Sequence, residues 1–184
     1  MDILSYLLGK NSTGGGGGGG GVDLSKYINL APSVVESPTA NWWTESFALS
    51  DMSKAEIVVS TNKMSYMFQN CKWTYIPKVS TNRTINNLFL NNMFQNCEHV
   101  TSLDLSGMVG SVGRISNTFN GCISLQHLDI RGLKISDASL YSATFNSVPI
   151  DCEIIVKDTT EKLWLATKFP SLINVKTVAD YEAQ

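Results

Sequence analysis

Four phenylalanines recur in this 184-residue chain at almost equal intervals. Their neighbours repeat with them, since the segments around them read MSYMFQNC, LNNMFQNC, ISNTFNGC and YSATFNSV. A period of 25 or 26 residues is typical of proteins built from stacked units, because one unit cannot cover its own apolar face. We therefore expect residues 61–157 to form four units that share one core. The phenylalanines are separated by 26, 25 and 26 residues and are Phe68, Phe94, Phe119 and Phe145.

Each unit also contains a pair of apolar or proline residues two positions apart. Side chains at this spacing lie on one face of an extended strand, so each unit is predicted to have one strand in a small parallel sheet. Apolar residues three apart, as at Met64 and Met67, instead predict a short helical turn before each strand. The strand pairs are Pro77 and Val79, Leu103 and Leu105, Leu128 and Ile130, and Ile154 and Val156.

The pattern Met-Phe-x-x-Cys followed by Leu-Asp-Leu resembles the BspA-type leucine-rich repeats of many bacterial surface proteins and of proteins of their phages. The resemblance covers roughly residues 61–157. It implies an α/β fold, a short leucine-rich-repeat solenoid of about four units of 25 or 26 residues. The first unit departs from the pattern with Pro77 at a strand position, which favours an irregular or edge strand. The last unit has Val148 in place of the cysteine.

The open ends of such a stack need covers. Residues 158–184 are predicted to supply the C-terminal cover as a capping helix and a last strand around Leu172–Val175. Asp158-Thr-Thr-Glu161 has the form of an N-terminal capping box, and Pro170 would end the helix. The expected apolar face of the helix consists of Leu163, Trp164, Leu165 and Phe169.

Residues 22–60 are predicted to form the N-terminal cap and the first strand. That strand is expected at Ala55–Val59, where the sequence is apolar and β-branched. Trp42, Trp43 and Phe47 could cover the open end of the core. An exposed aromatic patch that binds a ligand at Trp42 and Trp43 is the alternative.

Residues 14–21 are eight consecutive glycines, a composition typical of a flexible tether. The apolar run before them is too short for a secretion signal or a membrane span. The segment SYLLGK beside a glycine run resembles the N-termini of small phage tail-associated structural proteins, which implies that residues 1–13 dock on another virion protein. A terminus without a docking role is the alternative. The expected anchor side chains are Ile3, Leu4, Tyr6, Leu7 and Leu8.

The cysteines and histidines indicate neither a metal site nor a cofactor. Cys71, Cys97 and Cys122 share one column of the repeat, where a reduced cysteine serves as a small apolar residue, so free thiols are expected. The close C-x-x-C spacing of a zinc site is absent. His99 and His127 occupy different positions in their units and do not form a pair by register.

Asp104 and Asp129 share an outward column of neighbouring predicted strands, about 5 Å apart. Two stacked carboxylates could bind a cation or act as an acid and a base. Lys78 and Ile155 interrupt the column on either side, which favours a solvated polar face. No nucleophile with a histidine base can be assembled, so we expect the protein not to be an enzyme.

The expected function is a non-enzymatic phage virion protein of a tail or appendage, with an N-terminal anchor and outward-facing repeats. Its partners would be other virion proteins and a host surface protein or glycan. A homo-oligomer is expected by analogy. The net charge of −2 and the lack of a basic stripe argue against nucleic acid. The expected binding residues are Ser102, Asp104, His127 and Asp129.

Two other functions are compatible with the repeat pattern. A bacterial cell-surface adhesin-like module fits the repeats equally well, but it needs an export route that the N-terminal sequence does not indicate. A hydrolytic accessory protein, for example one that processes carbohydrates, would need carboxylates or a triad in a catalytic arrangement. The sequence does not provide one.

Overall fold

A computed structural model describes residues 33–35 and 56–184 of the chain. This part is α/β, with small parallel sheets and few helices. The predictions on residues 1–13, the glycine run and Trp42, Trp43 and Phe47 fall outside it. The helices are α2 (Thr159–Lys168), α3 (Val178–Glu182) and the 3-10 helix η3 (Ile135–Asp137). The strands are β1 (Ser33–Val35), β2 (Glu56–Val59), β3 (Lys78–Thr81), β4 (Leu88–Phe89), β5 (Ser102–Asp104), β6 (Gly110–Arg114), β7 (His127–Asp129), β8 (Leu133–Lys134), β9 (Glu153–Val156) and β10 (Val175–Thr177).

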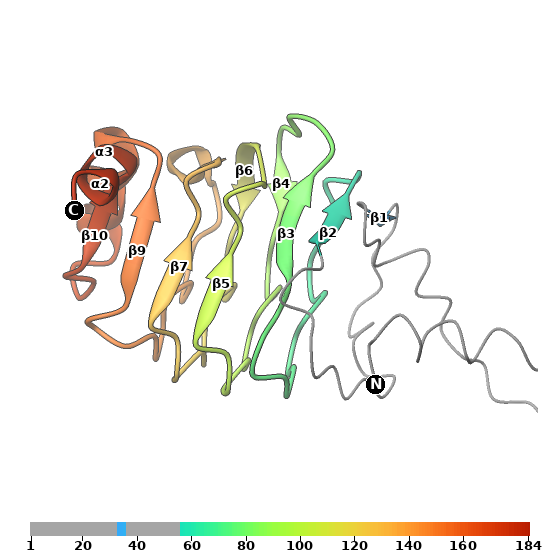
Figure 1. The fold of residues 1–184 in the computed structure, drawn as a ribbon, viewed down its shortest axis with the longest axis horizontal. Helices are drawn as coiled ribbons and strands as arrows, with labels where there is room; N and C mark the ends of the chain where they lie inside the picture. Colours follow the sequence, from blue (N-terminus) through green and yellow to red (C-terminus); the bar gives the residue numbers. More distant parts are fainter. Residues whose placement is uncertain (1–32, 36–55) are drawn as a thin grey trace, which may run out of the picture.

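The predicted strands of the second, third and fourth units lie side by side in one parallel sheet, in the order β10-β9-β7-β5 (Figure 1). Leu103 is opposite Leu128, and Leu128 is opposite Ile154, as the apolar pairs predicted. All three side chains are fully buried. Strand β2 lies where the sequence predicted the first strand, but β1, which was not predicted, precedes it in the chain and pairs with it in parallel.

The sheet is interrupted between β3 and β5, at the unit that contains Pro77. Strand β3 pairs with β2 in a separate sheet, β1-β2-β3, and meets the next unit at the isolated bridge between Ser80 and Gly107. Pro77 occupies the position of Leu103 in the repeat but has no backbone N–H to donate to a ladder. Strand β3 itself pairs with β2 in unbroken register and forms the edge of its sheet, so of the two expected outcomes, an irregular or an edge strand, the structure shows the edge strand.

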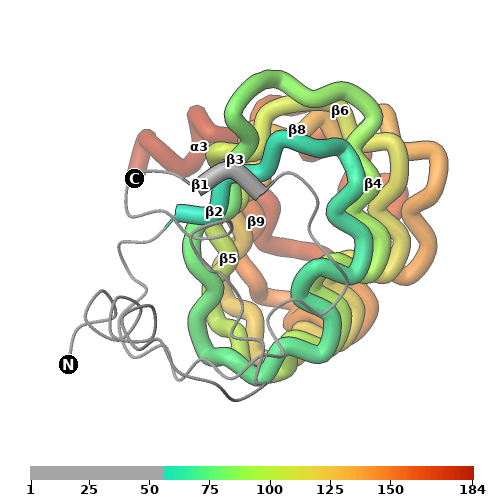
Figure 2. The backbone as a smooth tube through the Cα atoms, turned by 90° about the vertical axis from the view of Figure 1, so that its right-hand side faces the viewer, coloured from blue at the N-terminus to red at the C-terminus, as the bar shows by residue number. Residues whose placement is uncertain are grey.

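Strands β4, β6 and β8 form a further parallel sheet that the sequence analysis did not predict. Each of these strands has a side chain buried in the core, namely Leu88, Val112 and Leu133. Two of the strands have only two residues, too few to show the alternation by which a strand is recognised. Successive passes of the chain lie behind one another around a common interior (Figure 2).

The segment before each strand is not a helical turn, and that prediction was wrong. In the first unit, hydrogen bonds from Met67 N to Met64 O and from Cys71 N to Phe68 O close two successive four-residue turns. Tyr66 and Asn70, the third residues of these turns, have φ values of 65° and 59°. A left-handed residue at every fourth position cannot continue a right-handed helix, although both structures place apolar residues at similar spacings.

The turns of neighbouring units are joined by backbone hydrogen bonds. Phe68 N donates to Met93 O at 2.7 Å, and Phe94 N donates to Thr118 O at 2.9 Å. Similar bonds link alternate residues along each turn segment to the next unit. The units are thereby fixed in register at their turns as well as at their strands.

The phenylalanines that define the repeat form a stack through the core. Phe68 and Phe94 have ring centroids 5.2 Å apart, Phe94 and Phe119 are 5.8 Å apart, and Phe119 and Phe145 are 5.4 Å apart. Cys97 and Cys122 are fully buried beside this stack, and their thiols donate to the carbonyl oxygens of Phe68 and Phe94. The buried cysteines are free, as expected.

The thiols are expected to be unreactive in the native protein. Burial raises the pKa of Cys71 and of Cys152 to about 12, so almost none of the reactive thiolate is present at pH 8. Titration with a thiol reagent at pH 8 should detect four thiols in unfolded, unreduced protein and almost none in native protein. Fewer than four after unfolding would mean that a disulfide forms. Rapid reaction of native protein would contradict the burial.

Helix α2 begins at the predicted N-cap residue, but the predicted capping box forms only in part. The Asp158 carboxylate accepts hydrogen bonds from the backbone N–H groups of Thr160 and Glu161. The Glu161 carboxylate does not return to Asp158, because it accepts from the N–H and hydroxyl of Ser136 at 2.8 and 2.7 Å. Its side chain is only 1% exposed. The predicted reciprocal capping box is therefore wrong in its second half.

The apolar face of α2 is narrower than predicted. Leu165 is buried and Phe169 packs edge-on against Phe145 at 4.9 Å, but Leu163 is 62% exposed and does not cover the core. The last strand, β10, begins at Val175, later than predicted, and Leu172 is buried in the turn before it. Helix α3, which the sequence analysis missed, follows β10 directly.

Candidate binding surfaces

The four residues predicted to bind a partner lie on β5 and β7, on the outward side of the sheet that we call the strand face. Ser102 is opposite His127, and Asp104 is opposite Asp129. The structure thus brings the four together in the predicted register. Their surroundings, however, differ between the two strands.

The two aspartates each bind groups of their own unit. Asp104 accepts hydrogen bonds from the N–H and hydroxyl of Ser106, at 2.9 and 2.6 Å. Asp129 forms an ion pair of 2.8 Å with Arg131 and accepts a hydrogen bond from the backbone N–H of the same residue. Because Asp129 is only 7% exposed, the prediction of a solvated carboxylate is wrong at this position.

His127 is also engaged within the protein. Its Nδ1 lies 2.8 Å from Glu153, which binds Lys176 of β10 at 2.7 Å. The Tyr181 ring of α3 lies 6.1 Å from the His127 ring. Glu153 follows His127 by one repeat and could have been found by register, whereas nothing in the repeat pattern indicates Lys176 or Tyr181.

Helix α3 therefore covers the C-terminal part of the strand face. Arg131 lies 5.4 Å from the Tyr181 ring and 3.4 Å from Glu182, and both of these residues belong to the C-terminal cap. Ile155, which shares the outward column of Asp129, is fully buried. On β5, at the other end of the strand face, Ser102 and Asp104 remain partly exposed.

The ion pair between Lys176 and Glu153 predicts a measurable pKa change. Lys176, with a smaller contribution from His127, holds the pKa of Glu153 below its ordinary value of 4.5. This interaction stabilises the fold above pH 4.5 and is lost as the pH falls through the lowered pKa of the folded protein. In Lys176→Met, the Glu153 pKa should rise toward 4.5 in a carboxyl NMR titration.

A matched control for this titration is Lys157→Met. Lys157 is an exposed lysine at the rim of the cavity described next, and its replacement should leave the Glu153 titration unchanged. An unchanged Glu153 pKa in Lys176→Met would contradict the structure of this pair.

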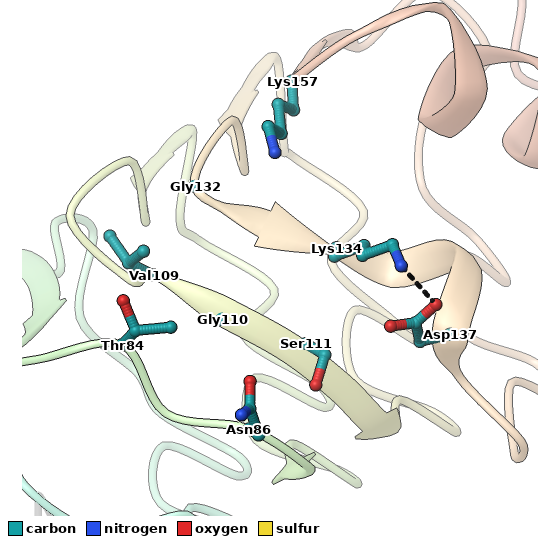
Figure 3. A pocket seen from close by; sticks show the side chains of 9 residues that line it. All are labelled: Thr84, Asn86, Val109, Gly110, Ser111, Gly132, Lys134, Asp137 and Lys157. Atoms are coloured by element: carbon teal, nitrogen blue, oxygen red, sulfur yellow. Dashed lines mark ion pairs between the residues drawn. The ribbon is translucent and has the colours of Figure 1, made fainter.

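An open cavity of about 330 Å³ lies beside β6 and β8 (Figure 3). Lys134 and Asp137 form an ion pair of 3.0 Å at one side of it. The lining offers hydrogen-bond donors and acceptors, but these residues do not include a nucleophile paired with a histidine base. They are Thr84, Asn86, Val109, Gly110, Ser111, Gly132, Lys134, Asp137 and Lys157.

Residues 33–35 and 56–184 contain no group of three or more His, Cys, Asp or Glu side chains placed to hold a metal ion. Within the same residues, no helix has the length and apolar character needed to cross a membrane.

The turn segments form a second extended surface, which we call the turn face. In each unit the buried phenylalanine and the residue before it are flanked on both sides by two outward residues. Four such positions in four units give sixteen surface positions, all partly or fully exposed. They are Ser65, Tyr66, Gln69 and Asn70; Asn91, Asn92, Gln95 and Asn96; Ser116, Asn117, Asn120 and Gly121; and Ser142, Ala143, Asn146 and Ser147.

Side-chain hydrogen bonds run along and between the units of the turn face. Gln69 donates to Gln95 at 2.7 Å, and Asn96 donates to Asn70 at 2.9 Å. Within one unit, Asn92 donates to Gln95 at 2.6 Å. This surface was not predicted, although the Asn and Gln residues that recur beside the repeated phenylalanines are visible in the sequence.

Comparison of the chain with protein-family models, with curated proteins and with solved structures finds no match.

Proposed function

We propose that the chain is a leucine-rich-repeat solenoid that serves as a non-enzymatic structural or receptor-binding protein of a phage virion, in a tail or appendage. Residues 1–13 would bind another virion protein, and the eight glycines at residues 14–21 would separate this anchor from the repeats. The repeats would display a binding surface to the outside.

The observation that carries this proposal is the regular joining of one unit to the next. Backbone hydrogen bonds connect the turns at each step, as from Phe68 to Met93 and from Phe94 to Thr118. Outward side chains at equivalent positions are therefore held in rows before any partner binds. A surface fixed in this way loses little conformational entropy on binding, which suits a display module.

The arrangement of ionisable groups also supports a binding role. Asp104, Asp129 and His127 are engaged by Ser106, Arg131 and Glu153 respectively. Groups held in this way orient one another and make the surface rigid. The proposal therefore assigns them to structure and to partner contacts rather than to bond-breaking chemistry.

Incorporation into particles tests the proposal. Mass spectrometry of purified virions should detect the full chain in a fixed ratio to the other structural proteins. A chain lacking residues 1–13 should be absent from the particles while its thermal unfolding remains that of the full chain. A chain in which residues 14–21 are replaced by a Gly-Ser sequence of equal length serves as the matched control and should be incorporated normally.

Two outcomes would refute the proposal. Normal incorporation of the shortened chain would remove the anchoring role of residues 1–13. Recovery of the full chain in the envelope of a bacterial cell, and not in particles, would favour the adhesin-like function in its place.

A further inference from the structure

We propose that the turn face binds an uncharged polysaccharide. This inference rests on the proposed function of a display module, and it names both the surface that binds and the chemistry of the partner.

The turn face carries no charged side chain. Asp, Glu, Lys, Arg and His are absent from its sixteen positions, although charged residues make up 16% of the chain. Nine positions carry Asn or Gln and four carry Ser. The strand face, by contrast, carries Asp104, Asp129 and Glu153. A ligand without charge fits the turn face, because it pays no penalty for desolvating an ion on either side.

The backbone accounts for only part of this composition. The second residue of each outward pair has positive φ, as at Asn92 and Asn96, and this conformation favours Asn and Gly. The first residue of each pair is the second residue of its turn, where most side chains are accepted. All eight of these positions nevertheless carry Ser, Asn or Gln. The turn geometry does not require this. Some of these side chains also bond to a neighbouring unit, as Gln69 does to Gln95, but the polar atoms that such bonds leave over are available to a ligand.

In the middle of the turn face, three side-chain amides each have one polar atom in a hydrogen bond and one without a partner among the described residues. Asn91 Oδ1 accepts from the backbone N–H of Ser116, and Gln95 Oε1 accepts from two neighbouring amides. Asn120 Nδ2 donates to Asn117. Within the described residues, the amino groups of Asn91 and Gln95 and the Asn120 carbonyl have no hydrogen-bond partner. Donors and acceptors fixed in this way can bind hydroxyl groups, which both donate and accept.

The rows of polar side chains on the turn face favour a polymer as the ligand over a single sugar and over a protein. Neighbouring units repeat at about 4.8 Å, so that a chain of linked sugars can meet similar amides at each step. Protein interfaces are enriched in aromatic residues, Met and Arg. On this face only Tyr66, at the edge of the first unit and 43% exposed, belongs to those classes. Its ring can also pack against the apolar side of a sugar.

Binding to defined polysaccharides tests the inference. The probes are soluble neutral glucans, mannans and galactans, with a sulfated polysaccharide and a polyuronate as charged comparators, in affinity electrophoresis of the full chain. At least one neutral polymer should retard the protein, and its dissociation constant should change less than about twofold between ~50 and ~500 mM salt, since no charges take part. Failure with every neutral polymer, or binding only to the charged ones, overturns the inference.

Variants locate the site. Asn91→Ala, Gln95→Ala and Asn120→Ala together should weaken binding about tenfold or more, because each removes a hydrogen-bonding group that the ligand would use. Gln95→Met alone keeps the size of the side chain and should weaken binding less, which covers the case in which the triple variant does not fold. Asn86→Ala, which removes an exposed amide at the cavity and outside the turn face, is the matched control. Full binding by folded turn-face variants overturns the inference.

Binding to host cells tests independently whether the partner is a polysaccharide or a protein. Binding of the full chain to host cells should be lost after periodate oxidation of their sugars and should survive protease treatment. The reverse result indicates a protein partner and overturns the inference. Deleting residues 1–13 should not change polysaccharide binding, so particle incorporation and sugar binding can fail separately.

Discussion

Replacing Phe94 with alanine should lower the free energy of unfolding by about 3–5 kcal/mol. Phe94 is fully buried and stacks between Phe68 and Phe119, so the change removes two ring contacts and leaves a cavity in the centre of the core. The backbone around it is held by hydrogen bonds to both neighbouring units and cannot easily collapse into the space. The loss would be a large part of a typical total of about 5–15 kcal/mol. Denaturant titration followed by circular dichroism measures it.

Leu163→Ala provides the control for this prediction. The sequence pattern placed Leu163 on the apolar face of the capping helix, but the side chain is 62% exposed. Its replacement should change the free energy of unfolding by no more than about 0.5 kcal/mol. Comparable losses in the two variants would mean that the phenylalanine stack does not dominate the core, or that α2 is placed incorrectly.

The repeat made the position of each unit predictable, but not the conformation of its turns. Phe68 and Phe94 recur in phase, and the strand pairs that follow them lie in register as expected. The spacing of Met64 and Met67 is common to a helical turn and to two successive turns with left-handed residues. The asparagines of the turns, such as Asn70, Asn92 and Asn96, tolerate positive φ and were the signal in the sequence that distinguished these structures.

The candidate site was predictable where its residues share the repeat and unpredictable where they come from the cap. The register of Asp104 with Asp129 followed from the 25-residue spacing between them. The cover provided by Tyr181, Lys176 and Glu182 depends on how α3 folds back onto β9 and β10, and no periodicity encodes it. A short C-terminal segment thereby decides which part of the strand face a partner can reach.

Gly110→Ala is expected to destabilise the fold by about 2–6 kcal/mol, from the sum of backbone strain and overpacking. Gly110 begins β6 with a φ of 149°, a conformation that residues with a Cβ rarely adopt. An added Cβ would lie 1.8 Å from the carbonyl oxygen of Ile85. That carbonyl is part of the backbone of the neighbouring unit, so no side-chain rotation can relieve the clash. Denaturant titration should show the loss.

Gly121→Asn is the matched control, because its glycine also has a positive φ but a different neighbour. Asn70 and Asn96 occupy the equivalent position in other units with φ values of 59° and 58°. A Cβ at Gly121 would meet the Asn96 side-chain oxygen at 2.4 Å, an atom that can rotate away, and the Asn96 backbone at 3.2 Å, a contact that a small shift relieves. The change should therefore cost less than about 1 kcal/mol. If Gly110→Ala were equally mild, the close approach of β6 to Ile85 would be wrong, and with it the parallel sheet of β4, β6 and β8 beside the cavity.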